Sequence, residues 1–537
     1  MLKINWKKNI NFGIWILIFG ILVHTRFVNL GWALPYPMHP DERNMANAVQ
    51  QLHCEVSSFK FQVSDCFNPH FFAYGQFPLY LSYIGIQLYH FLTGIFGQSI
   101  NFIEATMALR TLSAISSIIT AFILYKILSL FISKKDFTFH VLCFVLLSFS
   151  PALIQFSHFG TTESLLILLY STLVYISLLY LRNKLFATRY LFLTSLISGI
   201  ALATKVSSLF FIIVPLFGFL YQHRKRKKRL IINTCLFFTS MLLFFVIFSP
   251  HNILSINEFL GSMQYESDVA LGRISVFYTR QFSQSIPVLF QFTKIYPYAL
   301  GIPISLFAIL GFFFLPWRNI ELNIMRIAFL AIFLPSAFMF AKWTRFIAPT
   351  FPLLIILAIL FLSKIKFPRL LFPALCFISV IPGIAYLSIY QSPDVRFQAS
   401  SWIFKHIPDR SYILSETANV VDLPLENTNF VVISFNYYDV DSEPSLQSEL
   451  YYHIRQAQYI FVPSRRIFKN NIKYYPLLDQ YYHNLFSGKL GFRKVAEFTA
   501  YPKIELFGKK IFEFPDEDAE ETWTVFDHPV IRIYARK

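Results

Sequence analysis

Charged residues are scarce in this sequence. Only 14% of its 537 residues are Asp, Glu, Lys or Arg, whereas about a quarter are charged in soluble globular domains. This composition excludes a soluble protein as the main part of the chain. Cysteine is scarce as well, with five residues, which excludes a disulfide-rich secreted scaffold. The chain has 30 acidic residues (Asp and Glu) and 47 basic residues (Lys and Arg). Much of this basic excess lies in short clusters between apolar stretches, so a nucleic-acid partner is not expected.

Hydrophobic and aromatic residues are abundant. They make up 55% and 18% of the chain, with 63 Phe and 29 Tyr. Phe suits lipid-facing surfaces, and Tyr suits the membrane interface, where its hydroxyl stays hydrated. The sequence therefore predicts a polytopic α-helical membrane protein that is embedded in a lipid bilayer.

The first apolar stretch is NINFGIWILIFGILVHTRFV, residues 9–28. It is long enough to span a bilayer, and no small-residue cleavage site follows it, which favours a retained anchor over a signal peptide. We expect the N-terminus to be cytoplasmic.

Basic clusters between the later apolar stretches predict the topology. If all of them are cytoplasmic, the stretches must pair across short outer loops. The clusters are at 134–135, 182–189, 223–229, 318–326 and 364–369. The predicted spans are the first stretch, 107–131, 138–156, 162–181, 190–204, 206–221, 230–249, 287–316, 325–341, 346–362 and 370–390, about eleven in all.

Segment 77–97 does not fit this alternation. If it spanned the membrane, Lys134 and Lys135 would face outward. We place it as a juxtamembrane helix on the outer surface, although a re-entrant or spanning placement stays open.

These assignments divide the chain into two domains. Residues 1–390 form a transmembrane bundle with a first outer loop at 31–106, and residues 391–537 form an extracytoplasmic α/β domain in the cell envelope. β-like runs in the second domain are YILSE, NFVVISF, YIFVPS and VIRIYAR, and SELYYHIRQAQ is helix-compatible. None of its residues has the spacing of a nucleophile, metal or phosphate site, so we expect this domain to serve substrate recognition or stability.

The cysteines fall into two groups. Cys143, Cys235 and Cys376 lie in predicted spans, where small buried apolar residues are the expected reading. Cys54 and Cys66 lie in the first outer loop, where a disulfide and a reduced pair are both compatible with their spacing.

The outer loop carries the motif YPMHPDERN, residues 36–44. Pro40 suits the first turn of a helix, and the carboxylates of Asp41 and Glu42 suit its positive N-terminal end. Met45, Val49, Leu52 and Val56 continue the pattern as an apolar stripe at helical spacing. Asp41 is either a helix cap or a base whose ionised form the helix dipole favours.

Other charged residues lie on the same predicted side. They are Glu163 in SHFGTTES, Lys205 in SGIALATK, and Lys342 and Arg345 in AKWTRFIAP. Each alone suits a helix-start charge or a cation that extends to the interface. Together they place carboxylates and cations at one level of one membrane face, which a reaction on a lipid-borne phosphate needs.

The order of these motifs resembles a known superfamily. HPDE, FFAYGQFPLYL, SHFGTTES, SGIALATK, FSPHNILSINEFL and WTRFIAPTFPLL occur in this order. They resemble the GT-C membrane glycosyltransferases, more narrowly the bacterial phospholipid-carrier-dependent branch (glycosyltransferase family 39-like) related to protein O-mannosyltransferases and aminoarabinose transferases. The likeness covers most of residues 1–390, and the ending AEETWTVFDHPVIRIYARK also resembles bacterial members.

The resemblance implies roles for these residues. Asp41 stands at the position of the catalytic acid, with Glu42 orienting acceptor or base and Glu163 at the second acidic position. Lys205 and Arg345 match basic positions near the lipid phosphate, and we group Lys342 and His39 with them as substrate-binding candidates. No cofactor is required by the pattern. A divalent metal stays open, with His39, Asp41, Glu42 and Glu163 as candidate ligands.

The expected function is an inverting transfer of one sugar from a polyprenyl-phosphate donor to an extracytoplasmic acceptor, with Asp41 as the base. The acceptor is a protein, a glycan or a lipid. The alternative from another class is a transporter or flippase for a lipid-linked or small anionic substrate, which would move its substrate chemically unchanged. A structural scaffold is a third reading and would tolerate neutral residues at Asp41 and Glu163.

Overall fold

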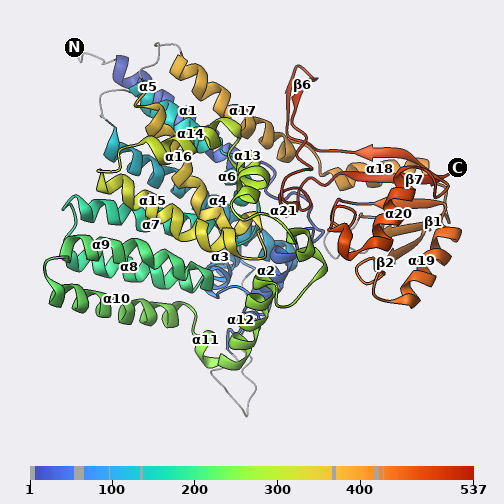
Figure 1. Cartoon of the computed structure of the whole chain (residues 1–537), viewed down its shortest axis with the longest axis horizontal. Coiled ribbons are helices and arrows are strands. Elements are labelled where there is room, and N and C mark those ends of the chain that lie inside the picture. Colours follow the sequence, from blue (N-terminus) through green and yellow to red (C-terminus); the bar gives the residue numbers. More distant parts are fainter. Residues whose placement is uncertain are drawn as a thin grey trace.

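The computed structural model describes residues 6–53, 66–95, 97–132, 137–365, 371–416, 423–426 and 429–537. It is a helical bundle with a smaller strand-containing domain at one end (Figure 1). The fold class predicted from the sequence is confirmed. The helices of the bundle and its outer loops are α1 (Trp6–Phe27), α2 (Pro40–Gln50), α3 (Phe77–Thr93), α4 (Phe102–Phe131), α5 (Phe137–Ser148), α6 (Pro151–His158), α7 (Glu163–Leu181), α8 (Ala187–Leu202), α9 (Ile213–His223), α10 (Lys227–Phe248), α11 (His251–Leu254), α12 (Ile256–Leu271), α13 (Tyr296–Ala299), α14 (Ile302–Phe314), α15 (Ile320–Phe338), α16 (Phe351–Leu362) and α17 (Leu371–Gln391). Short 3₁₀ segments are η2 (Val206–Ile212), η3 (Phe277–Phe282) and η5 (Thr344–Thr350), and η4 (Gln291–Ile295) is a π-helix.

Among the described residues, seven helices are long and apolar enough to cross a membrane, or nine if two bent pairs each count as one span. The pair α5 and α6 bends by 48° where Pro151 starts α6, and the second pair, 291–299 with 302–314, bends by 118° next to Gly301. Two shorter apolar helices cover Asn11–Phe27 and Ala187–Leu202. These segments coincide with the eleven predicted spans, whose number stays a prediction. Helix α3 is not among them.

Burial differs sharply between helices of similar hydrophobicity. In α16, every residue except Phe361 is buried, whereas α10 buries only Phe237 and Met241. A helix that is apolar all round lies either within a protein core or against lipid. Helix α16 is therefore the centre of the bundle, and α10 lies on its lipid-facing periphery.

The cysteines follow this arrangement. Cys143 and Cys376 are buried free thiols as predicted, but Cys235 is exposed because it lies on the peripheral helix α10, so the prediction that it is buried is wrong. Cys66 is disulfide-bonded, and Cys54 lies outside the described residues.

The C-terminal domain contains a five-stranded sheet in the order β2-β1-β3-β7-β4. Its elements are α18 (Val395–His406), β1 (Tyr412–Glu416), β2 (Val431–Phe435), α19 (Pro444–Gln456), β3 (Tyr459–Val462), η6 (Ile472–Tyr474), α20 (Pro476–Phe486), β4 (Phe492–Phe498) and β7 (Ile531–Arg536), with a separate hairpin of β5 (Lys503–Leu506) and β6 (Lys509–Glu513) and a short helix α21 (Glu521–Thr524). Strands β1, β2 and β3 are parallel, and β7 runs antiparallel to β3 and β4. All four predicted strands and the predicted helix are present.

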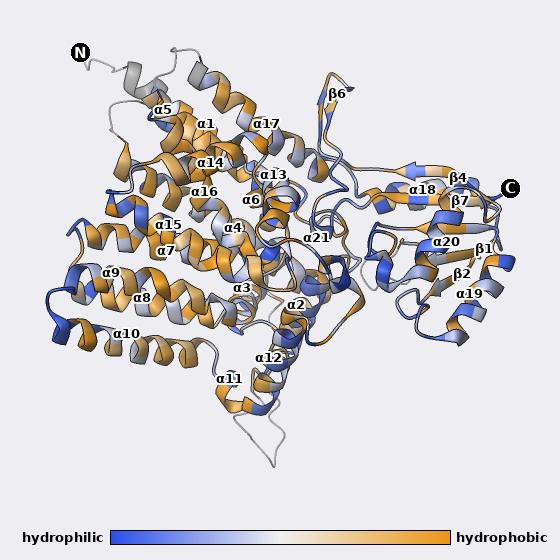
Figure 2. Cartoon of the chain, in the orientation of Figure 1, coloured by the Kyte–Doolittle hydropathy of each residue, from blue (hydrophilic) through white to orange (hydrophobic). Residues whose placement is uncertain are grey.

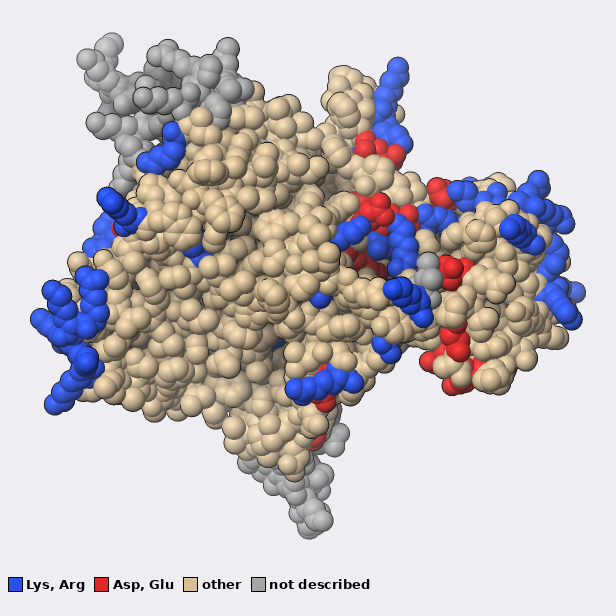
Figure 3. All heavy atoms as spheres, viewed as in Figure 1, with Lys and Arg blue, Asp and Glu red and all other residues tan. Residues whose placement is uncertain are grey.

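Charge is distributed unevenly over the molecule. In Figure 2 the bundle helices are mainly hydrophobic, and the hydrophilic residues gather at their ends and in the C-terminal domain. On the face seen in Figure 3, Lys and Arg gather at the end of the bundle opposite the C-terminal domain, and a broad uncharged belt separates the two. The loop between α9 and α10 and the first turn of α10 lie at that basic end, and their residues Arg224 to Arg229 are all exposed. A belt of this kind fits the hydrocarbon layer of a bilayer.

Candidate active site

The start of α2 positions the first candidate residues. His39 is the N-cap residue, since its ring accepts from the backbone N–H of Glu42 at 3.4 Å, and Pro40 begins the helix. The sequence left open whether Asp41 caps this helix. The cap is instead His39, which leaves the Asp41 carboxylate available for other contacts.

Glu42 points to a different environment. Its carboxylate accepts two hydrogen bonds from Arg110 on α4, both 2.7 Å long, and a third of 2.7 Å from the backbone N–H of Gly160. Arg110 also donates to the backbone oxygens of Leu30 and Trp32 at 2.8 Å. Glu42 and Arg110 are 2% and 1% exposed. This buried network joins α2, α4 and the α6–α7 turn, so Glu42 supports the turn that carries the second acidic motif.

Asp41 forms an ion pair with Arg345 at the start of η5. Arg345 also lies over the ring of Trp343, with 4.8 Å between its guanidinium carbon and the ring centre. Its buried Nε has no hydrogen-bond partner among the described residues. One buried donor of this guanidinium is therefore left unsatisfied by the described residues.

Glu163 and Lys205 make a second ion pair beside the first. Lys205 Nζ lies 3.3 Å from Glu163 Oε1 and 4.8 Å from the centre of the Tyr74 ring. The backbone next to Tyr74 packs directly against the backbone before Lys205. Only glycine fits at position 75, because a side chain there would place its Cβ 2.1 Å from the backbone oxygen of Ala203. Hydrogen bonds of 3.0 Å between segments 75–77 and 203–204 hold the two together.

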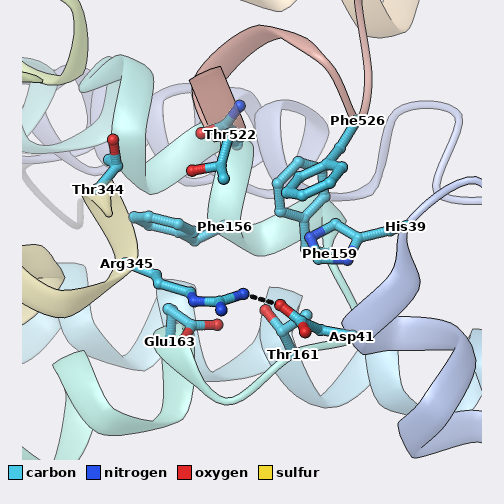
Figure 4. Close-up of a pocket in the computed structure, with 11 residues that line it drawn as sticks. His39, Asp41, Phe156, Phe159, Thr161, Glu163, Thr344, Arg345, Thr522 and Phe526 are labelled. Atoms are coloured by element: carbon cyan, nitrogen blue, oxygen red, sulfur yellow. Dashed lines mark hydrogen bonds and ion pairs between the residues drawn. The ribbon is translucent and has the colours of Figure 1, made fainter. Parts of the chain in front are cut away.

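His39, Asp41, Glu163 and Arg345 line one pocket with about 310 Å³ of empty volume (Figure 4). Its lining comes from the start of α2, α6, the α6–α7 turn, η5 and the C-terminal tail, and consists of His39, Asp41, Gln155, Phe156, Phe159, Thr161, Glu163, Thr344, Arg345, Thr522 and Phe526. Of the seven residues predicted from sequence, four line the pocket. Lys205 is not part of the lining, but it forms an ion pair with Glu163, which is. Glu42 and Lys342 are not part of the lining, and Lys342 donates instead to the backbone oxygen of Phe340 at 3.1 Å.

The electrostatics of the site follow from burial and pairing. Burial alone would raise the pKa of Asp41, but Arg345, with His39 and Lys205, holds it below its ordinary value. Burial lowers the pKa of His39, whose ring lies between Phe159 and Phe526 at 4.7 and 4.1 Å. Burial also raises the pKa of Glu266 on α12. The neighbouring charges thus favour the ionised form of Asp41, whereas burial disfavours the charged form of His39.

Three of the four candidate ligands for a divalent metal, His39, Asp41 and Glu163, line this pocket, and Glu42 does not. Within the part of the chain that the structure describes, no group of three or more His, Cys, Asp and Glu residues could hold a metal ion. The carboxylates of Asp41 and Glu163 are paired with Arg345 and Lys205, and Glu42 is paired with Arg110. Each candidate carboxylate therefore already has a cation.

Comparisons with known proteins identify the fold. The family model described as dolichyl-phosphate-mannose-protein mannosyltransferase matches residues 88–254. The oligosaccharyltransferase of Archaeoglobus fulgidus in its apo form has a TM-score of 0.51 at 12% identity, covering 99% of this chain and 89% of that chain. The chain has the GT-C fold. The resemblance seen in the sequence is confirmed at that level.

Two further solved structures are similar. The Archaeoglobus fulgidus oligosaccharyltransferase tethered to an acceptor peptide with the NVT sequon also has a TM-score of 0.51, 12% identity and coverages of 99% and 89%. ArnT from Cupriavidus metallidurans bound to undecaprenyl phosphate has a TM-score of 0.48 and 12% identity, covering 97% of this chain and 98% of that chain. A search of curated protein sequences gave no significant match.

The C-terminal tail is the part of this pocket that the sequence did not predict. Thr522 and Phe526 line the pocket, and Glu520 accepts from the backbone N–H and the hydroxyl of Thr344 at 3.0 and 2.9 Å. The only sequence signal was the likeness of the ending AEETWTVFDHPVIRIYARK to bacterial members. Tyr74, whose ring centre lies 4.8 Å from Lys205 Nζ, was also not predicted, although it lies in the quoted motif FFAYGQFPLYL.

Proposed function

We propose that the protein is an integral-membrane glycosyltransferase that transfers a sugar from a polyprenyl-phosphate donor to a hydroxyl acceptor outside the cytoplasm. The observation that carries the proposal is the pair of ion pairs at one pocket, Asp41 with Arg345 and Glu163 with Lys205. The family model matched by residues 88–254, whose description names a lipid-phosphate mannose donor, supports the same donor class.

The cations have a specific task in this reaction. When the sugar leaves, the phosphodiester of the donor becomes a phosphomonoester with an additional negative charge. Arg345 is partly exposed at the pocket and has an unpaired Nε, so it can hold the phosphate, with Lys205 adding positive charge nearby. A cation that is fixed where charge develops stabilises the transition state.

Asp41 is the proposed base. Its carboxylate takes the proton of the acceptor hydroxyl, the acceptor oxygen bonds to the anomeric carbon, and the bond from that carbon to the phosphate oxygen breaks. The electron pair leaves with the polyprenyl phosphate. Phosphate is a stable leaving group, so no separate acid is required, unlike in glycoside hydrolases. Attack from the face opposite the phosphate inverts the anomeric configuration.

The arriving phosphate also prepares the base. In the resting protein, Arg345 lowers the pKa of Asp41 and makes it a weak base. Once the donor phosphate engages Arg345, the carboxylate loses part of this pairing and becomes a stronger proton acceptor. Donor binding thus precedes activation of the acceptor in the proposed sequence.

The test is Asp41→Asn in purified protein that is reconstituted with a polyprenyl-phosphate sugar and an acceptor. The amide cannot take the proton, so we expect transfer to fall by about 10²-fold or more while the protein stays folded. The control is Asp409→Asn, which removes an exposed carboxylate of the C-terminal domain. Retained transfer in Asp41→Asn would contradict the assignment of the base, and a substrate that crosses the bilayer without forming a glycosidic product would favour the transporter.

A further inference from the structure

The hairpin of β5 and β6 is unusual for its exposed apolar side chains. Five of the twelve large hydrophobic residues that are exposed after residue 391 lie in this segment of twelve residues. Phe507 at the tip is 98% exposed, the largest fraction of the five. The other four are Leu506, Ile511, Phe512 and Phe514, which are 56%, 52%, 60% and 39% exposed.

Exposing so many apolar side chains to water is unfavourable in free energy. An isolated two-stranded hairpin is marginally stable, and this one has apolar residues at its tip in place of the polar residues that turns usually carry. Contiguous apolar patches of this kind mark binding sites for proteins or membranes. The hairpin therefore needs a partner surface.

The base of the hairpin is fixed near the membrane. The backbone N–H of Lys503 donates to the Ser388 hydroxyl at 3.1 Å, and Ser388 lies in the last turn of α17, a candidate span. Helix α17 exposes Phe377 and Ile378, by 67% and 48%. Figure 1 shows the hairpin projecting beside the end of α17, away from the five-stranded sheet and roughly across the direction of α7 to α10. A structure that starts at the end of a span and runs across the span direction lies along the bilayer surface.

The charges of the hairpin suit that surface. It contains Lys503, Lys509 and Lys510 against Glu505 and Glu513. Lys503 and Lys510 form ion pairs with these carboxylates at 2.6 and 2.7 Å. Lys509, which is next to the tip, has no ion pair among the described residues and is exposed. Aromatic side chains with a neighbouring lysine match the layer in which acyl chains meet phosphate headgroups.

We propose that residues 503–514 form a membrane-binding hairpin whose tip inserts Leu506 and Phe507 into the headgroup layer of the bilayer that holds the bundle. Its depth has a limit, because unpaired backbone groups at a sheet edge are not tolerated in the hydrocarbon core. The hairpin would hold the C-terminal domain, and with it the pocket-lining tail, in a set orientation to the lipid surface. This inference needs only the membrane-embedded bundle and does not depend on the proposed reaction.

The experiment places a fluorescent probe on the tip of the full-length protein. Phe507→Cys, in a Cys235→Ser background that removes the exposed native thiol, is labelled with an environment-sensitive dye and reconstituted in vesicles of phosphatidylcholine and phosphatidylglycerol. The matched control is Tyr451→Cys, a residue of α19 that is 64% exposed. We expect a blue-shifted emission at position 507 and stronger quenching by lipids spin-labelled near the headgroup than by lipids labelled deep in the acyl chain. The control probe should resemble dye in water.

A second variant separates the membrane from other partners. Lys509→Glu should weaken the quenching at position 507 when phosphatidylglycerol is present and change it little in phosphatidylcholine alone. Iodide quenching at position 507 equal to that at position 451 would overturn the proposal. A blue shift that persists in detergent and grows with protein concentration would also overturn it, since that result assigns the tip to a second copy of the chain.

Discussion

Neighbouring acidic residues do different work at this site. Asp41 and Glu42 are consecutive in sequence, but consecutive helix residues point about 100° apart. Asp41 therefore reaches the pocket, and Glu42 reaches Arg110 inside the protein. The sequence identified the motif and the four pocket residues His39, Asp41, Glu163 and Arg345. It did not predict that Glu42 pairs with Arg110, because no local pattern marks Arg110 on α4 as the partner of a residue 68 positions away.

This difference predicts opposite phenotypes for two similar substitutions. Glu42→Gln removes the counter-charge of Arg110, which is 1% exposed, and the loss of one partner of a buried pair costs about 3–5 kcal/mol. We expect a lower midpoint of thermal unfolding in detergent for Glu42→Gln, with little change for Asp41→Asn, whose partner is partly exposed. A stable but inactive Glu42→Gln would instead place Glu42 in the reaction.

A pH profile tests the coupling of Asp41 to Arg345. A base acts only when ionised, so kcat/KM falls as the pH drops through the pKa of the base in the free enzyme. Arg345 holds the pKa of Asp41 below its ordinary value, whereas burial acts to raise it. We therefore expect Arg345→Gln to move the acidic limb of the profile to higher pH. The control Arg273→Gln removes an exposed cation and should leave the limb in place, and an unmoved limb in Arg345→Gln would show that the titrating base lies elsewhere.

At the scale of elements, local patterns predicted strands well and long-range packing poorly. Alternation revealed β1, β2, β3 and β7, but β4 contains Arg493, Lys494 and Glu497, a charged pattern that suits a strand at the edge of a sheet. The contact of the tail with the bundle was hidden for another reason. Gln155 donates to the backbone oxygen of Trp523 at 2.8 Å across 368 residues, and no local pattern reports such a pairing.

Hydrogen bonds between the C-terminal tail and η5 predict how the tail affects donor binding. Glu520 accepts two hydrogen bonds from Thr344, the residue before Arg345, and a hydrogen bond to a charged group is worth about 1.5–3 kcal/mol. We expect Glu520→Ala to raise the donor KM by about tenfold or more, with a smaller effect on the acceptor KM. Glu520→Gln should raise the donor KM less than Glu520→Ala does, because the glutamine side chain keeps an acceptor oxygen.

A second carboxylate of the tail is the control. Glu517 pairs with Arg532 at 2.7 Å inside the C-terminal domain and makes no contact with Thr344. Glu517→Ala should therefore leave the donor KM near that of the unaltered protein. An equal rise in both variants would mean that the domain as a whole, and not the placement of η5, controls donor binding.

For the whole molecule, the eleven predicted spans depend on the alternation of basic clusters along the chain, and the structure adds a geometric argument. The loop between α9 and α10 lies at one end of the bundle and the C-terminal domain at the other (Figure 1), so the two ends face opposite sides of any bilayer around the uncharged belt. The positive-inside rule assigns the basic end to the cytoplasm. We therefore expect the pocket, which contains Thr522 and Phe526 from the tail, to open on the outer side.

Single-cysteine labelling in vesicles of known orientation tests this assignment. Lys225→Cys and Tyr451→Cys, each with Cys235→Ser, place one exposed thiol at each end. With a membrane-impermeant maleimide and right-side-out vesicles, we expect position 451 to react at once and position 225 only after the membrane is permeabilised. The reverse order would put the pocket on the cytoplasmic side. The acceptor would then have to be cytoplasmic, even if Asp41 and Arg345 still perform the chemistry proposed for them.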